Sequence, residues 1–472
     1  MNNSSTDVRR RLRLGLHRTE RPRPRPVDEG DLIRSRGAAV PPTARQWAVW
    51  LAVLSMLGGA LFLWPTLTAT ALHHLAFTVF AVAALSRLAA ALTADVRGLP
   101  APLPDDALPV YTVLAPLYRE AEIVPDLVRA LEALDYPRAK LQLLFVVEAD
   151  DPATLGALLD AALPAHAEIV VAPPGRPRTK PRACNVALEQ ATGALLTIYD
   201  AEDRPHPGQL REAAARFAAG SPRLACLQAP LRIDADRRFL PRQFAVEYAI
   251  QFEAMLPMLA RLGLPFPLGG TSNHFRTAAL RAVGGWDAWN VTEDADLGFR
   301  LAAEGYDLGV LVSPTFEPAP DRLSDWLPQR ARWVKGYMQT FGVQTRDPPH
   351  WRTGVMAAFA LTLGVAILAA FVHAPLLAFS LVGVVAGLWA GESWLAPADV
   401  ALLAAGWLCA MAAAAVASRR AARGLALSDL LLMPLYWPLH SLAAVHALVQ
   451  LIRSPHHWDK TRHAARTGQP PA

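Results

Sequence analysis

The stretch LQLLFVVEADD at residues 141–151 decides how the middle of this chain folds. Its first seven residues are apolar apart from Gln142. A continuous apolar run of this length, bounded by polar residues, is typical of a strand buried on both faces. Similar runs lie at 111–117, 168–172 and 194–199, and segments of helical spacing lie between them at 123–134, 154–163 and 183–190. Alternating buried strands and helices predict a parallel sheet with helices on both faces.

Acidic residues follow two of these strands. Glu148, Asp150 and Asp151 follow one, and Asp200, Glu202 and Asp203 follow another. The carboxyl ends of parallel strands meet at one edge of a sheet, where ligands bind. Any one of these acids could simply cap a helix. Like charges gathered at one edge repel, however, unless a cation compensates them. The sequence therefore predicts an oxygen-ligated Mg²⁺ or Mn²⁺ that also holds a diphosphate.

Two further polar segments lie downstream. Glu293 and Asp294 precede the helical run 297–303 and follow the small-residue loop GGTSN at 269–273. The basic segment QRARWVKG at 329–336 precedes an apolar block. Taken alone, the acids are typical of a helix cap, and the basic segment is typical of a helix beside a membrane with an interfacial Trp. Neither interpretation explains why both segments follow two acid clusters in one domain.

The apolar residues gather in blocks without Asp, Glu, Lys or Arg. Hydrophobic residues make up 53% of the 472 residues and charged residues 18%, whereas average soluble domains carry roughly 25% charged residues. This composition argues against an ordinary soluble enzyme. The blocks lie at 47–86, 354–391, 400–418 and 430–452. Because a membrane-spanning helix needs about 20 apolar residues, we expect two spans in the first block, broken near Pro65, and two in the second, broken near residues 373–375. The last two blocks fit one span each.

Positive charge orients these spans. The net charge is +5, and the Arg-rich tail 1–46 is predicted to be a disordered cytoplasmic anchor beside the membrane rather than a nucleic-acid arm. Six spans would then place Arg419, Arg420 and Arg423 on the outer side, against the positive-inside bias. Either one C-terminal block is re-entrant or interfacial, with Pro434 and Pro438 pointing to the last block, or this loop is an exception.

The cysteines and tail histidines carry little functional signal. Cys184, Cys226 and Cys409 are too few and too widely spaced for a disulfide framework or a metal cluster, so we expect buried reduced thiols. We expect His456, His457 and His463 to be solvated tail residues. No zinc spacing is visible and the basic runs lie beside membrane, so no nucleic-acid partner is expected.

Four polar elements in this order, between apolar helices, resemble a known family. They are Glu148 with Asp150, Asp200-Ala201-Glu202, Thr292-Glu293-Asp294, and Gln329 with Arg332 and Trp333; Lys180 and Asn185 add a further match. The pattern resembles membrane-integrated family 2 glycosyltransferases of the processive type, such as cellulose, hyaluronan and related bacterial exopolysaccharide synthases. The resemblance covers roughly 108–345 and the flanking apolar blocks.

The resemblance implies an α/β GT-A-type nucleotide-sugar domain inserted between transmembrane α-helices. The expected parts are the tail 1–46, two transmembrane helices in 47–93, the cytoplasmic GT-A domain 108–345, about four transmembrane or interfacial helices in 352–452, and a basic cytoplasmic tail 453–472. The expected location is a bacterial-type inner (plasma) membrane.

The resemblance also implies roles for single residues. Asp294, with Glu293 beside it, would be the general base. The donor would be bound by Glu148, Asp150, Lys180, Asp200, Glu202 and Arg332. Gln329 and Trp333 would lie at the acceptor channel mouth. Asp200 and Glu202 would bind the metal, and Asp203 could replace Glu202, because Glu stands at 148 and 202 where the family more often has Asp.

The expected activity is inverting, processive β-glycosyl transfer from a nucleotide sugar, with a UDP-sugar favoured, to a growing exopolysaccharide that is exported across the membrane. The expected partners are the donor, the polysaccharide acceptor, the lipid bilayer and envelope-export proteins. Two alternatives stay open: a non-processive enzyme that adds a single sugar to a lipid carrier, and a non-catalytic component of an envelope-export complex.

Overall fold

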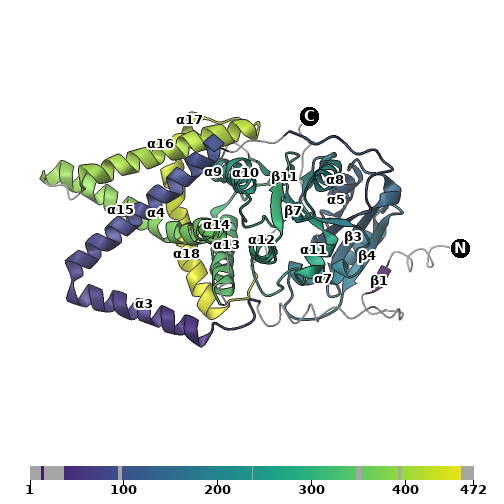
Figure 1. Cartoon of the computed structure of the whole chain (residues 1–472), viewed down its shortest axis with the longest axis horizontal. Helices are drawn as coiled ribbons and strands as arrows, with labels where there is room; N and C mark the ends of the chain where they lie inside the picture. Colours follow the sequence, from purple (N-terminus) through teal and green to yellow (C-terminus); the bar gives the residue numbers. More distant parts are fainter. Residues whose placement is uncertain are drawn as a thin grey trace.

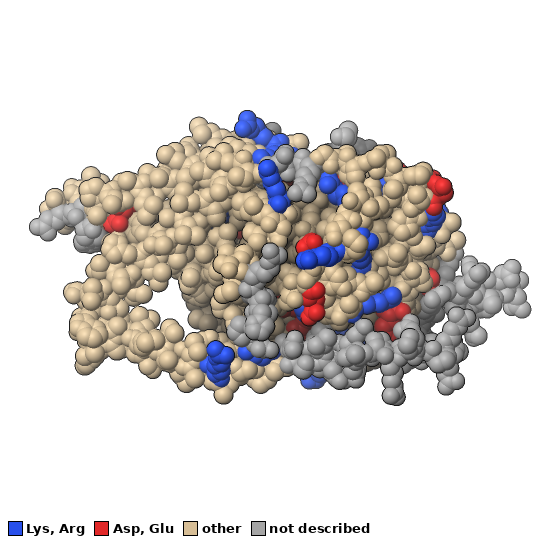
Figure 2. Space-filling model, in the orientation of Figure 1, with Lys and Arg blue, Asp and Glu red and all other residues tan. Residues whose placement is uncertain are grey.

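The computed structural model describes residues 12–14, 37–93, 98–235, 238–346, 353–391 and 395–458. Figure 1 shows long helices at one end of the molecule and an α/β domain at the other. On the face seen in Figure 2, charged side chains are sparse over the long helices and gather over the α/β domain. The charge-free blocks of the sequence therefore form one separate layer of the structure.

Eight strands form the main sheet, in the order β1-β4-β3-β2-β5-β9-β7-β10. The strands are β1 (Leu12–Leu14), β2 (Tyr111–Leu117), β3 (Leu141–Glu148), β4 (Ala167–Ala172), β5 (Leu195–Ile198), β7 (Leu224–Gln228), β9 (Asn273–Arg276) and β10 (Asp307–Val310). Neighbours pair in parallel except at β9, which is antiparallel to β5 and β7. A second sheet contains β6 (Arg204–Pro205), β11 (Thr315–Pro318) and β8 (Leu231–Asp234).

The core confirms the α/β prediction. Successive β2 residues belong to different buried clusters: Tyr111 and Val113 to one and Leu114 to the other. Both faces of the sheet are therefore covered. The covering and connecting helices of the domain are α5 (Val124–Glu132), α6 (Pro152–Asp160), α7 (Lys180–Leu188), α8 (Gln209–Ala219), α9 (Phe239–Ile250), α10 (Leu256–Arg261), α11 (Thr277–Ala282), α12 (Glu293–Ala303) and α13 (Leu323–Gln344).

The antiparallel strand β9 was not predicted, because its sequence Asn-His-Phe-Arg lacks an apolar run. Instead, its buried polar side chains are stabilised by hydrogen bonds. The His274 Nδ1 atom lies 2.6 Å from the Tyr111 hydroxyl, and its Nε2 atom lies 3.0 Å from Gln209 Oε1. Long-range partners that satisfy a buried imidazole cannot be seen in the local pattern.

Within the part of the chain that the structure describes, five continuous helices are long and apolar enough to cross a membrane, by length and composition. They are α3 (Ala44–Leu63), α4 (Pro65–Thr93), the joined α14 (Thr353–Phe359), π-helical segment 360–364 and α15 (Val365–Ala390), then α16 (Pro397–Arg420), and α18 (Met433–Arg453). The break predicted near Pro65 is confirmed, since α3 ends at Leu63 and α4 begins at Pro65.

The break expected near residues 373–375 is wrong, because α15 continues through Pro375. The Ser441 side chain from α18 supports the helix at this point. The Ala374 amide donates to Ser441 Oγ (3.0 Å), and Ser441 Oγ donates to the Ala370 carbonyl (2.6 Å). A hydroxyl from a neighbouring helix thus bridges a backbone donor and acceptor, as happens at prolines in membrane helices.

Both ends of α18 contact the α/β domain. Before its start, Asp429 of α17 (Leu427–Leu431) pairs with Arg242 of α9. After its end, the His457 carbonyl accepts a 2.7 Å hydrogen bond from Lys335 of α13. Figure 1 shows α18 lying between the domain and the other long helices, across their direction.

The tails are described only in part. Three residues of the N-terminal tail form β1, parallel to β4, and residues 454–458 pack on the domain. The prediction of a disordered tail 1–46 is wrong for residues 37–46: the Ala38 amide donates to Asp287, Arg346 donates to the Gly37 and Val40 carbonyls, and α3 begins at Ala44. The remaining tail predictions, including the disorder of most of 1–36 and the exposure of His463, fall outside the described residues. The three cysteines are free thiols, with Cys184 and Cys226 buried and Cys409 half-buried, as expected apart from the partial exposure of Cys409.

Candidate active site

One cavity of about 540 Å³ begins at the carboxyl ends of β2 and β5 and continues between the long helices. Its lining includes most of the predicted site residues, namely Glu148, Lys180, Asp200, Glu202, Glu293, Asp294, Gln329, Arg332 and Trp333. Asp150 and Asp203 are absent from the lining. The site stands where β2 has β3 on one side and β5 on the other, which is where open α/β sheets bind ligands.

Glu148 ends β3 at one edge of the cavity. Both of its carboxylate oxygens accept 3.2 Å hydrogen bonds from Arg182 of α7. Burial raises the pKa of Glu148, and Arg182 opposes that rise. Asp150 instead pairs with Arg178 at 2.7 Å, and it is Arg178 that lines the cavity. Arg178 and Arg182 were not predicted, because their partners lie about thirty residues upstream along the chain.

Asp200 follows β5 and forms an ion pair with Lys180 at the start of α7. Lys180 Nζ also donates to the Gly270 carbonyl at 2.6 Å. Burial lowers the pKa of Lys180, but the charges of Asp200 and Glu293 outweigh burial and raise that pKa above its ordinary value. Lys180 is therefore a fixed cation between the two acid clusters; the donor-binding role that the resemblance implies for it stays a prediction.

Asp203 lies beneath the cavity floor and is 1% exposed. Its carboxylate accepts a 2.7 Å hydrogen bond from the Asp200 amide and another hydrogen bond from the Thr271 hydroxyl. Burial, followed by the charges of Asp200 and Glu202, raises its pKa well above the ordinary value. Asp203 thus holds the turn that presents Asp200 and ties it to the GGTSN loop.

Glu317 on β11 is a cavity residue that the sequence analysis missed. Burial and the charges of Asp203 and Glu202 raise its pKa well above the ordinary value. A single Glu in a short strand gives no local signal. Its proximity to the other acids depends on the pairing of β11 with β6, which follows Asp203 directly.

Glu293 and Asp294 begin α12. Glu293 is 5% exposed, and burial together with the Asp294 charge raises its pKa to about 8. Burial also raises the pKa of Asp294, although the Ala295 amide donates to Asp294 at 2.7 Å and Lys180 and Arg332 favour its charged form. The bare backbone of Gly270 faces Asp294: a Cβ there would lie 3.4 Å from Asp294 Oδ2.

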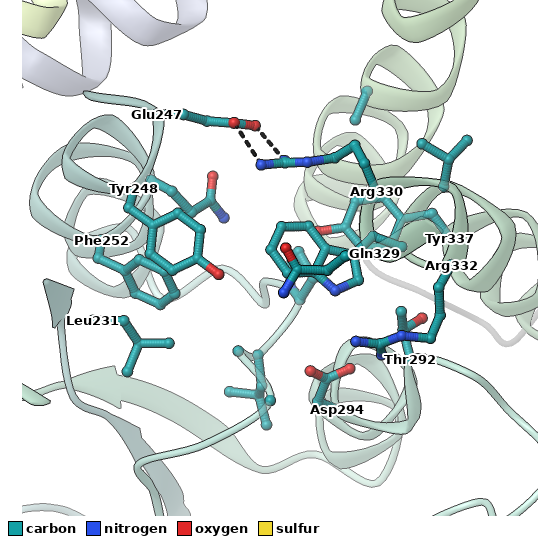
Figure 3. A pocket seen from close by; sticks show the side chains of 18 of the residues that line it. Leu231, Glu247, Tyr248, Phe252, Thr292, Asp294, Gln329, Arg330, Arg332 and Tyr337 are labelled. Atoms are coloured by element: carbon teal, nitrogen blue, oxygen red, sulfur yellow. Dashed lines mark hydrogen bonds and ion pairs between the residues drawn. The ribbon is translucent and has the colours of Figure 1, made fainter. Parts of the chain in front are cut away.

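Helix α13 brings the basic segment over these acids. Figure 3 shows Arg332 reaching from α13 toward Asp294, with Thr292 beside it. The guanidinium lies 4.6 Å from the ring centre of Trp458, which also lines the cavity. Arg332 can reach Asp294 because α13 packs closely on the start of α12. Glycine at position 336 permits this close approach, since a Cβ there would overlap the Thr292 side chain.

Gln329 and Trp333 line the middle of the cavity. The buried Gln329 Oε1 has no hydrogen-bond partner among the described residues. Trp333 lies 6.1 Å from Tyr248, measured between ring centres, and Tyr248 lies 5.4 Å from Phe252. The Arg330 guanidinium lies 4.4 Å from the ring centre of Trp333. Figure 3 shows the same guanidinium paired with Glu247. These rings form an aromatic wall beside an unsatisfied amide.

The carboxylates suit a hard divalent cation. Among the described residues, no group of three or more His, Cys, Asp or Glu side chains is arranged to hold a metal alone. Mg²⁺ commonly takes only one or two carboxylates and completes its shell with substrate phosphates and water. Asp200 and Glu202 present such an all-oxygen pair to the cavity, so the residues fit a metal that arrives with a diphosphate.

The C-terminal residues are closer to the site than expected. Besides Trp458 in the cavity lining, His456 Nδ1 lies 3.0 Å from the Trp289 carbonyl, and the two rings meet edge to face at 5.1 Å. His456 is therefore not a simple solvated tail residue. Sequence position alone does not reveal such docking, because it follows from both ends of α18 meeting the domain.

Comparison with known proteins agrees with this arrangement. The family model "Glycosyl transferase family group 2" matches residues 195–418. A beta-monoglucosyldiacylglycerol synthase from Synechocystis sp. is 26% identical over 238 residues, covering 49% of this chain and 49% of that protein. Cellulose synthase 2 from Novacetimonas hansenii is 28% identical over 249 residues, covering 51% of this chain and 15% of that protein. The matched region thus spans about half, or less, of these relatives.

A solved structure has the same fold. The mannosyltransferase PcManGT from Pyrobaculum calidifontis, in complex with GDP-Man and Mn²⁺, aligns with a TM-score of 0.53 at 19% identity, covering 81% of this chain and 97% of that chain. The acid clusters at the strand ends and these comparisons lead to one conclusion: the α/β domain has the GT-A fold, and residues 195–418 match the model of glycosyltransferase family group 2.

Proposed function

We propose that this chain is an inverting glycosyltransferase that moves a sugar from a nucleotide sugar, with a UDP-sugar favoured, to an acceptor entering from the membrane side. The single observation that carries the proposal is the shared cavity. It is lined by Asp200 and Glu202, by Asp294, and by residues of the long helices α4 and α15. A donor and a membrane-side acceptor can therefore meet in one enclosed space.

The donor end would hold the nucleoside diphosphate. Mg²⁺ or Mn²⁺ bound by Asp200 and Glu202 would supply positive charge to the departing diphosphate. The Mn²⁺ and GDP-Man in the complex of the fold neighbour support this assignment. Lys180 and Arg332 add fixed positive charge aimed at the same space. Glu148, held by Arg182, would face the nucleoside, and Asp150 would act there through Arg178.

Asp294 would accept the proton of the attacking acceptor hydroxyl. In that step the acceptor oxygen bonds to the anomeric carbon, and the bond from that carbon to the diphosphate oxygen breaks, with the electron pair leaving on the diphosphate. A buried base with a raised pKa is suited to this proton transfer near neutral pH. The protonated Glu293 beside it leaves Asp294 as the charged member of the pair.

We further propose processive extension of a polysaccharide and its export across an inner membrane. The aromatic wall of Trp333, Tyr248 and Phe252 beside Gln329 supports this proposal, since sugar rings stack on aromatic faces while amides bond hydroxyls. The second candidate is a single transfer to a lipid carrier. Small apolar residues of α4, α15 and α16, such as Ala83, Ala369 and Ala410, favour it because they suit an acyl or isoprenoid chain.

We also propose that four helices, α3, α4, α14–α15 and α16, cross the membrane and that α18 lies at its cytoplasmic surface. The contacts at both ends of α18 support this. So do Arg420 and Arg423, which donate hydrogen bonds to the Glu253 and Arg242 carbonyls of the domain. With four spans, the domain, the arginines that follow α16, and both tails share the cytoplasmic side.

The test uses the purified full chain in detergent with Mg²⁺ or Mn²⁺ and a panel of radiolabelled nucleotide sugars. We expect nucleoside diphosphate release matched by sugar incorporation into a ladder of long products, with both lost in Asp200→Asn. A single-sugar lipid adduct would overturn processivity in favour of the second candidate. Absence of turnover with every donor would leave only the non-catalytic export role.

A further inference from the structure

Three basic side chains at the membrane end of the cavity have no part in the mechanism above. Arg87 of α4, His373 of α15 and His440 of α18 all line the cavity. We propose that these residues, here called the basic site, bind the phosphate headgroup of a lipid acceptor. This inference rests on the second candidate of the proposed function, transfer to a lipid carrier, and names the chemical class of that carrier.

The two histidines lie together with free ring nitrogens. Their ring centres are 6.3 Å apart, and His373 stacks on Trp437 at 5.8 Å. The Nδ1 atoms of both are buried and have no hydrogen-bond partner among the described residues. A buried polar atom without a hydrogen-bond partner costs free energy. A ligand that forms hydrogen bonds with these Nδ1 atoms would remove that cost.

The charges around the basic site favour binding of an anion. Arg330 makes two hydrogen bonds to Glu247, of 2.6 and 2.8 Å, and the Tyr436 hydroxyl donates a third at 2.8 Å. His440 Nε2 approaches the same carboxylate at 3.5 Å. Glu247 is thus engaged, and no hydrogen bond or ion pair to Arg87 is found among the described residues. Arg330 therefore occupies the Glu247 carboxylate, and no ion pair among the described residues compensates the charge of Arg87.

An uncompensated arginine beside membrane helices is expensive and usually functional. Arg87 lies six residues before the end of α4 at Thr93, or about 9 Å along the axis at 1.5 Å per residue. Beyond His373, α15 runs another 17 residues to Ala390, about 26 Å, close to the hydrocarbon thickness of about 30 Å. The basic site is therefore at the depth of phospholipid headgroups.

The surroundings favour a lipid over a free anion. Beside the basic site, the cavity is lined by Ala83, Val365, Ala369 and Ala410 from three long helices. Burial of a hydrocarbon chain against such a lining is favourable. The same apolar lining forms no hydrogen bond or ion pair with inorganic phosphate. Charge at one end and apolar surface beside it match a phosphate ester on a hydrocarbon chain.

The experiment measures binding of dioleoyl phosphatidic acid to the purified full chain in detergent by native mass spectrometry. Dioleoylglycerol, which lacks the phosphate, and inorganic phosphate, which lacks the chains, are the comparison ligands. We expect tight binding of phosphatidic acid only, weakened at least about tenfold by Arg87→Gln and retained in Arg87→Lys. Arg45→Gln, at an exposed arginine beginning α3, is the matched control and should change nothing.

Equal binding of phosphatidic acid to the wild type and Arg87→Gln would overturn the proposal, as would equal binding of dioleoylglycerol or of phosphate alone. His373→Gln provides a second test if Arg87→Gln fails to fold, and should also weaken binding. Donor turnover is measured in the same preparations. Turnover without Arg87-dependent lipid binding contradicts this inference alone, whereas lipid binding without any turnover contradicts the proposed function.

Discussion

Glu293 and Asp294 are adjacent carboxyl groups whose pKa values are set by different surroundings. Both are raised in pKa by burial, but Asp294 accepts a hydrogen bond from the Ala295 amide and is favoured as an anion by Lys180 and Arg332. Two titratable neighbours with separated pKa values allow one to stay protonated while the other acts as base. Their roles in catalysis should therefore appear in the pH dependence of the reaction.

We predict a bell-shaped pH profile for kcat/KM. Asp294 must be charged to accept a proton, so activity rises with pH through a pKa above the ordinary aspartate range. Glu293 loses its proton near its pKa of about 8, and the new charge repels the diphosphate, so activity falls above about pH 8. Initial rates from pH 5 to 10 check this. Glu293→Gln should abolish the alkaline fall; an unchanged fall would contradict its assignment.

Asp203 provides a second prediction at this scale. Replacing it by Ala removes the carboxylate that accepts from the Asp200 amide and the Thr271 hydroxyl. These donors keep only longer hydrogen bonds, of 3.3 Å to Thr271 Oγ1 and 3.2 Å to the Ile198 carbonyl, so the change should cost about 1–3 kcal/mol of unfolding free energy. Asp203→Asn retains an acceptor oxygen and should cost less. Thermal unfolding measures the stability of both variants, and nucleotide binding with Mn²⁺ measures metal use. Loss of metal-dependent binding in a stable Asp203→Asn protein would instead make Asp203 a ligand.

The acid clusters themselves could be predicted from sequence, because strand ends in a parallel sheet place them together. The partners that set their charge could not. Arg182 and Glu317 reach the site through contacts with residues distant in sequence, and no periodic pattern encodes such pairings. The distinction between Glu202 in the cavity lining and Asp203 beneath it also depends on which way one turn faces.

At the scale of elements, helix α13 carries the basic segment and places Arg332 beside Asp294. It packs so closely on the start of α12 that residue 336 has to be Gly, since a Cβ there would overlap Thr292. The second glycine of the helix, Gly342, has open space around it. The two positions therefore form a natural pair for a substitution experiment.

We predict that Gly336→Ala destabilises the protein by about 1–3 kcal/mol through overpacking and lowers sugar transfer by displacing Arg332 from Asp294. Gly342→Ala should be neutral or stabilising by up to about 1 kcal/mol, because Ala is the better helix former. Chemical denaturation and transfer rates measured on both variants check this. Equal effects at the two positions would show that the α12–α13 contact is unimportant.

Strands β2 to β5, helices α5 to α7 and the long apolar helices could be predicted from the sequence, since apolar runs of strand length and charge-free blocks of helix length are strong local signals. Strands β6 to β11 were not predicted. Two of the differences from prediction have clear long-range causes. Strand β9 is polar but satisfied by Tyr111 and Gln209, and Pro375 is tolerated because Ser441 of α18 supplies the bridging hydroxyl. In both cases a distant side chain overrides the local preference.

For the whole molecule, the arrangement of α18 changes how the chain is expected to sit in a membrane. Six spans would put the arginines at and after the end of α16 outside, whereas the structure holds Arg420 and Arg423 against the α/β domain. The conflict with the positive-inside bias disappears because α14–α15 is one continuous helix and counts as one span. An interfacial α18 then keeps the C-terminal tail on the cytoplasmic side as well. The sequence could only point to Pro434 and Pro438 as signs of an irregular last block.

We predict that a cysteine at Ala422, after α16, reacts with a membrane-impermeant maleimide only from the cytoplasmic side, whereas one at Ala398, at the other end of α16, reacts only from outside. Both variants are made in a Cys409→Ala background, since Cys184 and Cys226 are buried. Labelling of intact cells and inverted vesicles distinguishes the sides. Reaction at position 422 from outside would contradict the four-span arrangement.

The central claim for the molecule is sugar transfer with Asp294 as base, and the most direct measurement compares Asp294→Asn with wild type in purified full chain. Transfer from the best donor and binding of its nucleotide are measured together. We predict a fall in transfer of about 10²–10⁴-fold with nucleotide binding retained, because the amide keeps the side-chain shape but accepts no proton. Full transfer activity in Asp294→Asn would contradict the account.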